Sequence, residues 1–154
     1  MLVDRGFKVP GSQERPDEIP KEPQPFCERF SWYLHKYFER NPNDKNADIY
    51  RRAGLSKQRF SKILSERKSD FRPRKQTVLA LAIGLKLTVR EGEDLLRSSG
   101  FSFSSSDKTD LMAKCLLAEE NYNIFEWNER IYAKTGRIFF EALCAKNDKG
   151  EVDE

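Results

Sequence analysis

Two short helical patterns meet at Gly54, and this junction constrains the fold more than any other stretch of the chain. Before it, residues 47–53 place apolar side chains four positions apart, on one face of a helix. After it, Ser56 is a residue type that favours the N-cap of a helix, here one over residues 57–66. Glycine readily adopts the left-handed conformation of a tight turn. We therefore predict helix, turn and helix, with three apolar side chains of the second helix buried: Phe60, Ile63 and Leu64.

Helical patterns also fill most of the remaining chain. Residues 26–38 carry apolar side chains at three- and four-residue spacing. Residues 78–85 are almost wholly apolar, and their Leu and Ala content favours a buried helix over a strand. Thr88 and Glu91 have the spacing of a capping box, which opens a helix that Gly100 ends. We predict two further helices, over about 108–120 and 124–134, whereas residues 137–145 fit a last helical turn or a strand.

Composition divides the chain into four segments. At 154 residues it is long enough for one domain with flexible ends. Residues 1–25 hold five prolines among polar and charged residues, a composition that suits an extended or disordered arm. Residues 26–100 hold the first five predicted helices, and residues 101–145 form an additional helical segment, for packing or dimerisation. Residues 146–154 are a polar tail.

Charge is distributed unevenly, although the net charge of the chain is only +3. Residues 57–75 contain eight basic and two acidic residues, a net charge of +6. Residues 107–129 contain six acidic and two basic residues, a net charge of −4. Two interpretations fit the basic stretch, a nucleic-acid-binding surface and a solvated helix face. If the first is correct, the acidic segment should point away from the basic one.

The last two predicted helices are rich in aromatic residues. One apolar stripe is formed by Leu111, Cys115 and Ala118, and a second by Ile124, Trp127 and Ile131. Among such apolar positions, we expect Cys27 and Cys115 to behave as small hydrophobic residues. A single buried face cannot hide all four aromatic side chains of this region, so they either pack on the bundle or form a dimerisation or partner-docking surface. These four are Tyr122, Phe125, Trp127 and Tyr132.

Several classes of function lack their sequence signals. No apolar run approaches the roughly 20 residues of a membrane span, and the charged N-terminus does not resemble a signal peptide. Three widely spaced cysteines indicate a reduced, cytoplasmic protein. The single histidine, His35, cannot build the common zinc sets, and no phosphate-binding glycine motif occurs. We therefore expect no metal, no cofactor, no membrane association and no enzymatic activity.

The exposed face at the start of the second helix has side chains suited to DNA. Lysine can donate to the guanine acceptors of the major groove, and glutamine can pair bidentately with adenine. Lys57, Gln58, Ser61 and Lys62 are the side chains that this face would present. Exposed aromatic residues, which single-stranded RNA readers use for stacking, are not interleaved with them, so RNA is the weaker candidate.

From Asp48 to Thr88 the chain resembles the Xre/Cro family of phage-repressor-like helix-turn-helix regulators. The resemblance rests on the helix-turn-helix, on the basic loop that ends in "RPR", and on the following "LALAIGLKLTVREGEDLL". It covers residues 26–100, about half of the chain. It implies an all-α fold, a five-helix bundle extended here by two C-terminal helices, and binding to double-stranded DNA, often as a homodimer. The chain departs from the family at Tyr50, where a small residue commonly lies four positions before the turn glycine.

The resemblance also implies roles for individual residues. Base reading is implied for Lys57, Gln58, Ser61 and Lys62. Phosphate binding is implied for Ser56, Arg59, Arg67, Lys68, Arg72, Arg74 and Lys75. We therefore expect a DNA-binding transcriptional regulator, and the alternative is a non-enzymatic adaptor that binds a protein partner through the aromatic and acidic helix around Trp127.

Overall fold

Seven α-helices and no β-strand make up residues 19–140, the part of the chain that the computed structural model describes. Five helices lie before Gly100 and two after it, so the expectation of an all-α fold with two additional C-terminal helices is confirmed. The helices are α2 (Phe26–Arg40), α3 (Asn46–Arg52), α4 (Lys57–Ser65), α5 (Lys75–Gly84), α6 (Val89–Ser98), α7 (Lys108–Ala118) and α8 (Ile124–Thr135).

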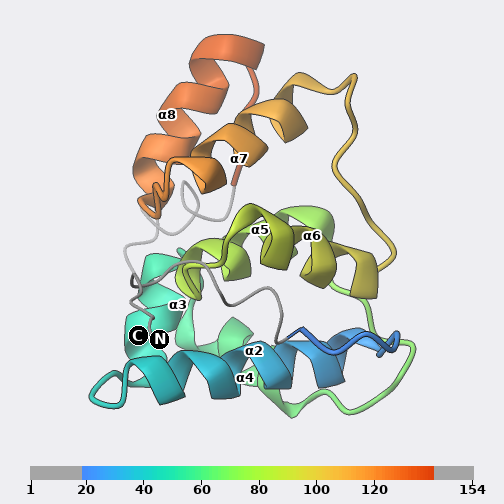
Figure 1. The fold of residues 1–154 in the computed structure, drawn as a ribbon. Coiled ribbons are helices and arrows are strands. Elements are labelled where there is room, and N and C mark those ends of the chain that lie inside the picture. The colour runs from blue at the N-terminus through green and yellow to red at the C-terminus, as the bar shows by residue number, and fades with distance from the viewer. Residues whose placement is uncertain (1–18, 141–154) are drawn as a thin grey trace, which may run out of the picture.

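The helices are stacked in three levels (Figure 1). Helix α4 packs on α2 and α3, at one end of the molecule. Helices α5 and α6 form the middle, where α5 contacts α3 and α6 contacts α2. The α7–α8 hairpin packs on α6 at the opposite end from α4. The acidic segment 107–129 therefore lies away from the helix-turn-helix, an arrangement compatible with either interpretation of the basic stretch.

Helix α5 is the centre of the core, because every residue from Thr77 to Gly84 is buried. A helix that is apolar on all sides must be surrounded by other elements, and α5 is covered by α3 on one side and α6 on another. This explains why residues 78–85 lack the one-sided pattern of the other helices. The choice of helix over strand for this segment is confirmed.

Gly84 brings α3 and α5 into close contact near the turn. A Cβ atom on Gly84 would lie 2.7 Å from the carbonyl oxygen of Ile49 and 3.0 Å from the Cβ of Ala53. The Gly84 carbonyl oxygen also accepts a hydrogen bond of 2.6 Å from Arg52 Nη1. The small residues at this crossing, Gly84 and Ala53, therefore position the first helix of the helix-turn-helix on the core.

We expect Gly84→Ala to lower the free energy of unfolding by up to about 2 kcal/mol. The usual cost of overpacking is about 1–3 kcal/mol, and the roughly 1 kcal/mol that alanine gains over glycine in a helix offsets only part of it. Gly92→Ala is the matched control, because there the new Cβ would meet only Leu117 Cδ1, at 3.1 Å, the end of a flexible side chain. It should leave stability unchanged or raise it by up to about 1 kcal/mol. Urea unfolding of both variants measures the difference, and equal losses would contradict the close contact at Gly84.

The predicted stripe on α7 is wrong. Leu111 is 45% exposed, and Cys115 and Ala118 are exposed as well. The buried apolar side chains of α7 are Ala113, Leu116 and Leu117. Both faces of this helix carry apolar residues, and the face with two adjacent leucines is the one that packs on α6 and α8. The expectation of a buried Cys115 is therefore corrected, while Cys27 is half-buried.

The stripe on α8 is confirmed, and it removes Trp127 from any surface. Trp127 is fully buried between α7 and residues 137–140, and its ring centroid lies 5.4 Å from that of Phe139. Its Nε1 donates a hydrogen bond of 2.6 Å to the carbonyl oxygen of Asn121. Of the two alternatives, packing on the bundle therefore holds for Trp127, and the docking surface does not include it. The residue shares the core-facing side of α8 with Ile124 and Ile131.

The other three aromatic residues of the predicted interface differ among themselves. Tyr122 is half-buried, and its hydroxyl donates a hydrogen bond of 2.8 Å to the carbonyl oxygen of Leu87. Burial, with a smaller contribution from Glu120, raises the pKa of Tyr122 to about 12. Phe125 and Tyr132 are 63% and 58% exposed. Only these two of the four residues present a large surface.

The ends of the chain are described only in part. Residues 19–25 contain no helix or strand, and residues 137–140 likewise form neither, although Phe139 and Phe140 are buried. The rest of the predicted arm, the polar tail and the segment 141–145 lie outside the described residues. Within residues 19–140, no helix combines the length and the apolar composition that a membrane span requires.

Candidate nucleic-acid interface

A tight turn joins α3 to α4. Gly54 has a φ of 73°, the left-handed conformation that favours glycine. The Gly54 N–H donates to the Arg51 carbonyl oxygen at 3.1 Å, and the Leu55 N–H donates to the Tyr50 carbonyl oxygen at 2.9 Å. The turn itself thus provides hydrogen bonds for these two carbonyl groups at the end of α3. Ser56 then caps α4, since its Oγ accepts a hydrogen bond of 3.1 Å from the Arg59 N–H. The predicted turn at Gly54 and the predicted N-cap at Ser56 are confirmed.

Aromatic packing sets the orientation of α4. Phe60 is buried, with its ring centroid 6.1 Å from that of Phe30 on α2 and 5.6 Å from that of Tyr50 on α3. Ile63 is buried as predicted, and Leu64 is half-buried. The family that the chain resembles commonly has a small residue at the position of Tyr50. In this chain the Tyr50 ring packs against Phe60 of α4. The close approach of helices occurs at Gly84 instead.

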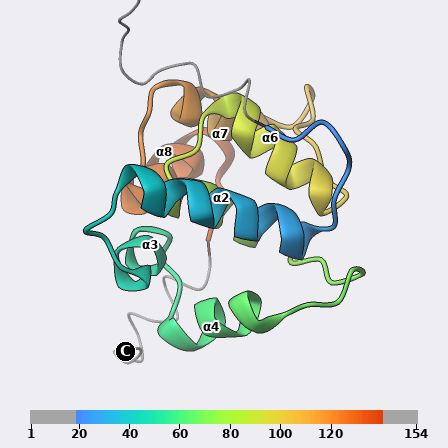
Figure 2. The same ribbon diagram turned by 60° about the horizontal axis from the view of Figure 1, so that its bottom comes forward.

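The opposite face of α4 is fully open to solvent. The four predicted base-reading residues, Lys57, Gln58, Ser61 and Lys62, are all exposed and lie on this face. Their side chains make no hydrogen bond or ion pair with any residue of the range 19–140. Ser65 continues the same face one turn later and is also exposed. Figure 2 shows α4 at the lower edge of the bundle, below α2 in that view.

The N-terminus of α4 is suited to an anion. The backbone N–H groups of the first turn carry a partial positive charge, and no acidic residue lies in that turn to offset it. Lys57 adds a full positive charge at the first helical position. A phosphate group beside this end of the helix would therefore meet both the helix dipole and a lysine.

The basic loop between α4 and α5 is anchored to α2. The ring centroid of Phe71 lies 6.1 Å from that of Phe26, Pro73 is buried, and Cys27 Sγ approaches the Lys68 carbonyl oxygen at 3.7 Å. With the backbone held in this way, the basic side chains of the loop point outward. Three exposed ones make no ion pair within the described part of the chain: Lys68, Arg72 and Arg74.

The remaining predicted phosphate-binding cations have partners inside the fold. Arg59 Nη2 donates to Thr77 Oγ1 at 3.3 Å, which connects α4 to α5. Arg67 Nη1 donates to the Leu64 carbonyl oxygen at 2.6 Å, at the end of α4. Lys75 Nζ lies 2.6 Å from Asp110 Oδ2, and the Asp110 side chain is only 3% exposed. Ser56 is half-buried and used as the cap. These four residues therefore hold α4 and the loop in place, and their side chains are less available to bind phosphate than those of Lys68, Arg72 and Arg74.

Asp110 is a structural residue that sequence patterns did not single out. Its carboxylate accepts from Lys75 Nζ and from the Ser104 N–H, each at 2.6 Å, and so connects α5 to α7. From the sequence, an aspartate near the start of a helix indicates only a favourable interaction with the helix dipole. The ion-pair partner of Asp110, Lys75, lies 35 residues away in the sequence. No local pattern contains that information.

The chain matches no family model, no curated protein and no solved structure. The functional interpretation of α3 and α4 consequently rests on the geometry of the turn, the exposed face and the basic loop.

Proposed function

We propose that the chain binds double-stranded DNA as a sequence-specific transcriptional regulator, with the exposed face of α4 in the major groove. The observation that carries the proposal is the unpaired polar face formed by Lys57, Gln58, Ser61 and Lys62 on a helix whose other side is fixed by Phe60. A short helix that projects from a bundle, with a glycine turn before it, is how helix-turn-helix proteins reach base edges.

Phosphate contacts come from both ends of the α4–α5 unit in this proposal. The N-terminus of α4 and the exposed loop side chains Lys68, Arg72 and Arg74 would contact the backbone on either side of the groove. Such contacts supply affinity and register, whereas the lysines and the glutamine on α4 select the sequence. The acidic hairpin α7–α8 lies at the opposite end, where it does not repel the DNA (Figure 1).

The experiment that tests the proposal is selection from a randomised pool of duplex DNA at about 150 mM salt, where contacts to phosphate alone are weakened. We expect enrichment of one motif, and the logarithm of the binding constant should fall with the logarithm of salt concentration by about 0.9 for each phosphate contact. Arg74→Gln should reduce that slope by about 1 and weaken all sequences equally. If no sequence is enriched from the pool, the proposal is overturned, and the basic stretch is a solvated helix face.

A homodimer is part of the proposal. Phe125 and Tyr132 on α8 are its expected contact surface because, within residues 19–140, they are the large aromatic side chains that are most exposed. A dimer should select two half-sites about one helical turn apart. Sedimentation of Phe125→Ser with Tyr132→Ser should then show a monomer that selects a single half-site. A dimer that persists in this variant would place the contact elsewhere.

A further inference from the structure

The cations predicted to bind phosphate differ in whether the fold neutralises their charge. Arg59 and Arg67 donate to uncharged oxygen atoms, a hydroxyl and a backbone carbonyl, so each keeps its positive charge. Three others make no ion pair with any residue of the range 19–140: Lys68, Arg72 and Arg74. Within that range Lys75 alone among these cations pairs with a carboxylate, because its Nζ lies 2.6 Å from Asp110 Oδ2. The charge of Lys75 is therefore cancelled inside the protein.

Asp110 is held in place by other contacts besides Lys75. Its side chain is 3% exposed, and its Oδ2 also accepts a hydrogen bond of 2.6 Å from the Ser104 N–H. The Asp110 N–H donates to Asp107 Oδ2 at 3.3 Å, in the cap of α7. Hydrogen bonds between charged groups are strong, and more so where water is excluded. The carboxylate is therefore a preorganised partner for the Lys75 ammonium group.

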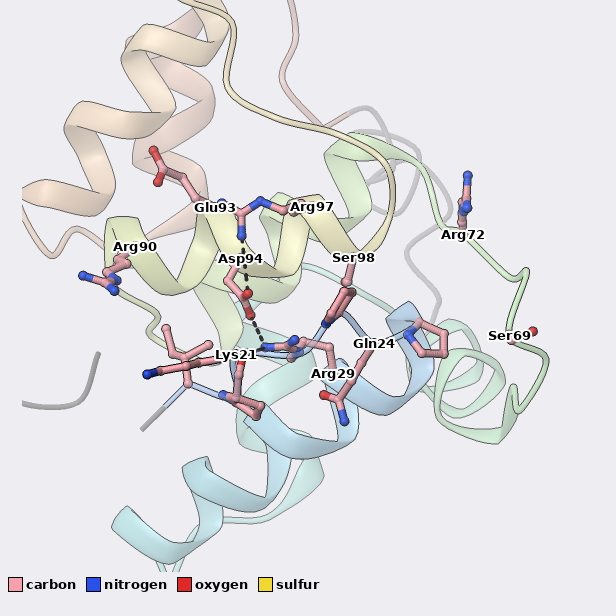
Figure 3. A pocket seen from close by; sticks show the side chains of 14 residues that line it. Lys21, Gln24, Arg29, Ser69, Arg72, Arg90, Glu93, Asp94, Arg97 and Ser98 are labelled. Carbon is pink, nitrogen blue, oxygen red and sulfur yellow. Dashed lines mark hydrogen bonds and ion pairs between the residues drawn. The ribbon is translucent and has the colours of Figure 1, made fainter. Parts of the chain in front are cut away.

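Lys75 begins α5 and directly follows the basic loop. Arg72 and Arg74 of this loop are exposed, and Figure 3 shows the Arg72 side chain projecting from the loop, apart from the side chains of α2 and α6. Consecutive Cα atoms are only about 3.8 Å apart, and the lysine side chain is a flexible four-carbon stem. If Asp110 released it, Lys75 could therefore present its charge beside that of Arg74.

A second ion pair of low exposure shows how Lys75 differs from a purely structural cation. Arg29 is 3% exposed, and it donates to Asp94 Oδ2 at 2.9 Å and to two backbone carbonyl groups of residues 19–25 (Figure 3). The Lys75 side chain is 28% exposed, and its ammonium group has no hydrogen-bond partner other than Asp110 among the described residues. Asp110 alone thus keeps this cation inside the fold.

A neutral pair adds little to the electrostatic part of DNA binding. That part grows with the number of phosphates that are neutralised by positive charge, since each one releases counterions. The buried carboxylate and a DNA phosphate are alternative partners for the same ammonium group. The loop has anchors of its own, Phe71 against Phe26 and the buried Pro73, so it should stay in place when the ion pair is broken.

We propose that Asp110 is an autoinhibitory residue, which holds Lys75 back from the DNA backbone. This role rests on the proposed DNA binding and extends it, because the α7–α8 hairpin then sets the number of phosphate contacts that the α4–α5 unit makes. A change that moved the start of α7 away from α5 would add one contact and strengthen binding to every sequence alike.

Asp110→Asn tests this role, with a random-sequence duplex as the probe and a series of salt concentrations from about 50 to 300 mM. The slope of the logarithm of the binding constant against the logarithm of salt concentration should steepen by about 0.9, and affinity should rise about fivefold at about 150 mM salt. An asparagine oxygen can still accept from the Ser104 N–H, so the variant should fold, which circular dichroism verifies. Lys75→Gln should leave the slope of the otherwise unchanged chain as it is, and should abolish the gain when combined with Asp110→Asn.

Glu93→Gln is the matched control. Glu93 Oε2 lies 3.6 Å from Lys114 Nζ, in an ion pair that also joins the hairpin to the bundle but frees a lysine on α7 when it is broken. The net charge of the chain changes by the same amount as in Asp110→Asn. The slope should not change. An equal gain in this control, or a gain in Asp110→Asn that persists with Lys75→Gln, would overturn the role, because overall charge or a loosened hairpin would then explain it.

The remaining outcomes separate this role from DNA binding itself. If Lys75→Gln alone lowers the slope by about 0.9, Lys75 already contacts phosphate and Asp110 does not inhibit, a result that decides the question even if Asp110→Asn fails to fold. If the unchanged chain binds the duplex and a folded Asp110→Asn shows no gain, the autoinhibitory role is wrong and DNA binding stands. If neither binds at about 50 mM salt, the proposed DNA binding is wrong, and this role with it.

Discussion

Trp127→Ala is expected to destabilise the chain by about 3–5 kcal/mol, the cost of deleting a large aromatic side chain from a core. Trp127 is fully buried, packs on Phe139 and donates a hydrogen bond from Nε1 to Asn121, all of which the variant loses. Stabilities of small domains are of the same order, so the variant should be largely unfolded or close to it. Circular dichroism during urea unfolding measures the loss.

Tyr132→Ala is the matched control on the same helix. Tyr132 is 58% exposed and lies on the opposite side of α8 from the α7 contact. At a protein concentration at which the chain is monomeric, its replacement should change the free energy of unfolding by no more than about 0.5 kcal/mol, as is usual for surface positions. If Trp127→Ala were as mild as Tyr132→Ala, the packing of the α7–α8 hairpin described above would be incorrect. The pair therefore separates a core role from an interface role for this aromatic helix.

Lys57→Glu with Lys62→Glu should reduce DNA affinity by about a hundredfold or more. Each well-placed base contact contributes about 1–3 kcal/mol of discrimination, and the reversed charges add repulsion from phosphate. Both side chains are exposed and have no partner among residues 19–140, so the fold should be unaffected. Fluorescence anisotropy with the selected duplex measures the affinity, and thermal unfolding verifies the fold.

The control for this variant is Lys108→Glu with Lys134→Glu. It makes the same change in net charge at two exposed positions of the α7–α8 hairpin, away from α4. It should leave DNA affinity within about threefold, because charges further away than the Debye length of about 8–10 Å are screened. Equal losses in the two variants would mean that overall charge, and not the face of α4, governs binding.

The α4–α5 unit and the α7–α8 hairpin are connected by an ion pair between a partly exposed lysine and a buried aspartate. Lys75 at the start of α5 contacts Asp110 at the start of α7, and Asp110 also holds the loop through the Ser104 N–H. The α4–α5 loop ends at Arg74, next to Lys75, so the position of this loop depends in part on the hairpin. This gives residues 101–140 a structural role in shaping the candidate interface, in addition to any contact with a second copy.

Local signals explain why each helix of residues 19–140 could be predicted from the sequence. The caps at Ser56, Thr88, Asp107 and Asn123 satisfy backbone groups within three residues, and Gly54, Gly100 and Gly136 adopt positive φ at helix ends. The exposed face of α4 was predictable for a similar reason, since its buried side chains are spaced at helical intervals. Such information is contained in short segments of chain.

The tertiary structure decided what no short segment contains. Both faces of α7 are apolar, and only packing on α6 and α8 selects Leu116 and Leu117 over Leu111. The aromatic residues of α8 likewise divide into a buried Trp127 and an exposed Phe125 and Tyr132. The carboxylate partners of Lys75 and Arg29 lie 35 and 65 residues away in the sequence. Whether these cations are paired inside the fold therefore depends on how the helices pack. Sequence periodicity specifies which residues share a face, whereas tertiary packing decides which face is buried and which charges are neutralised.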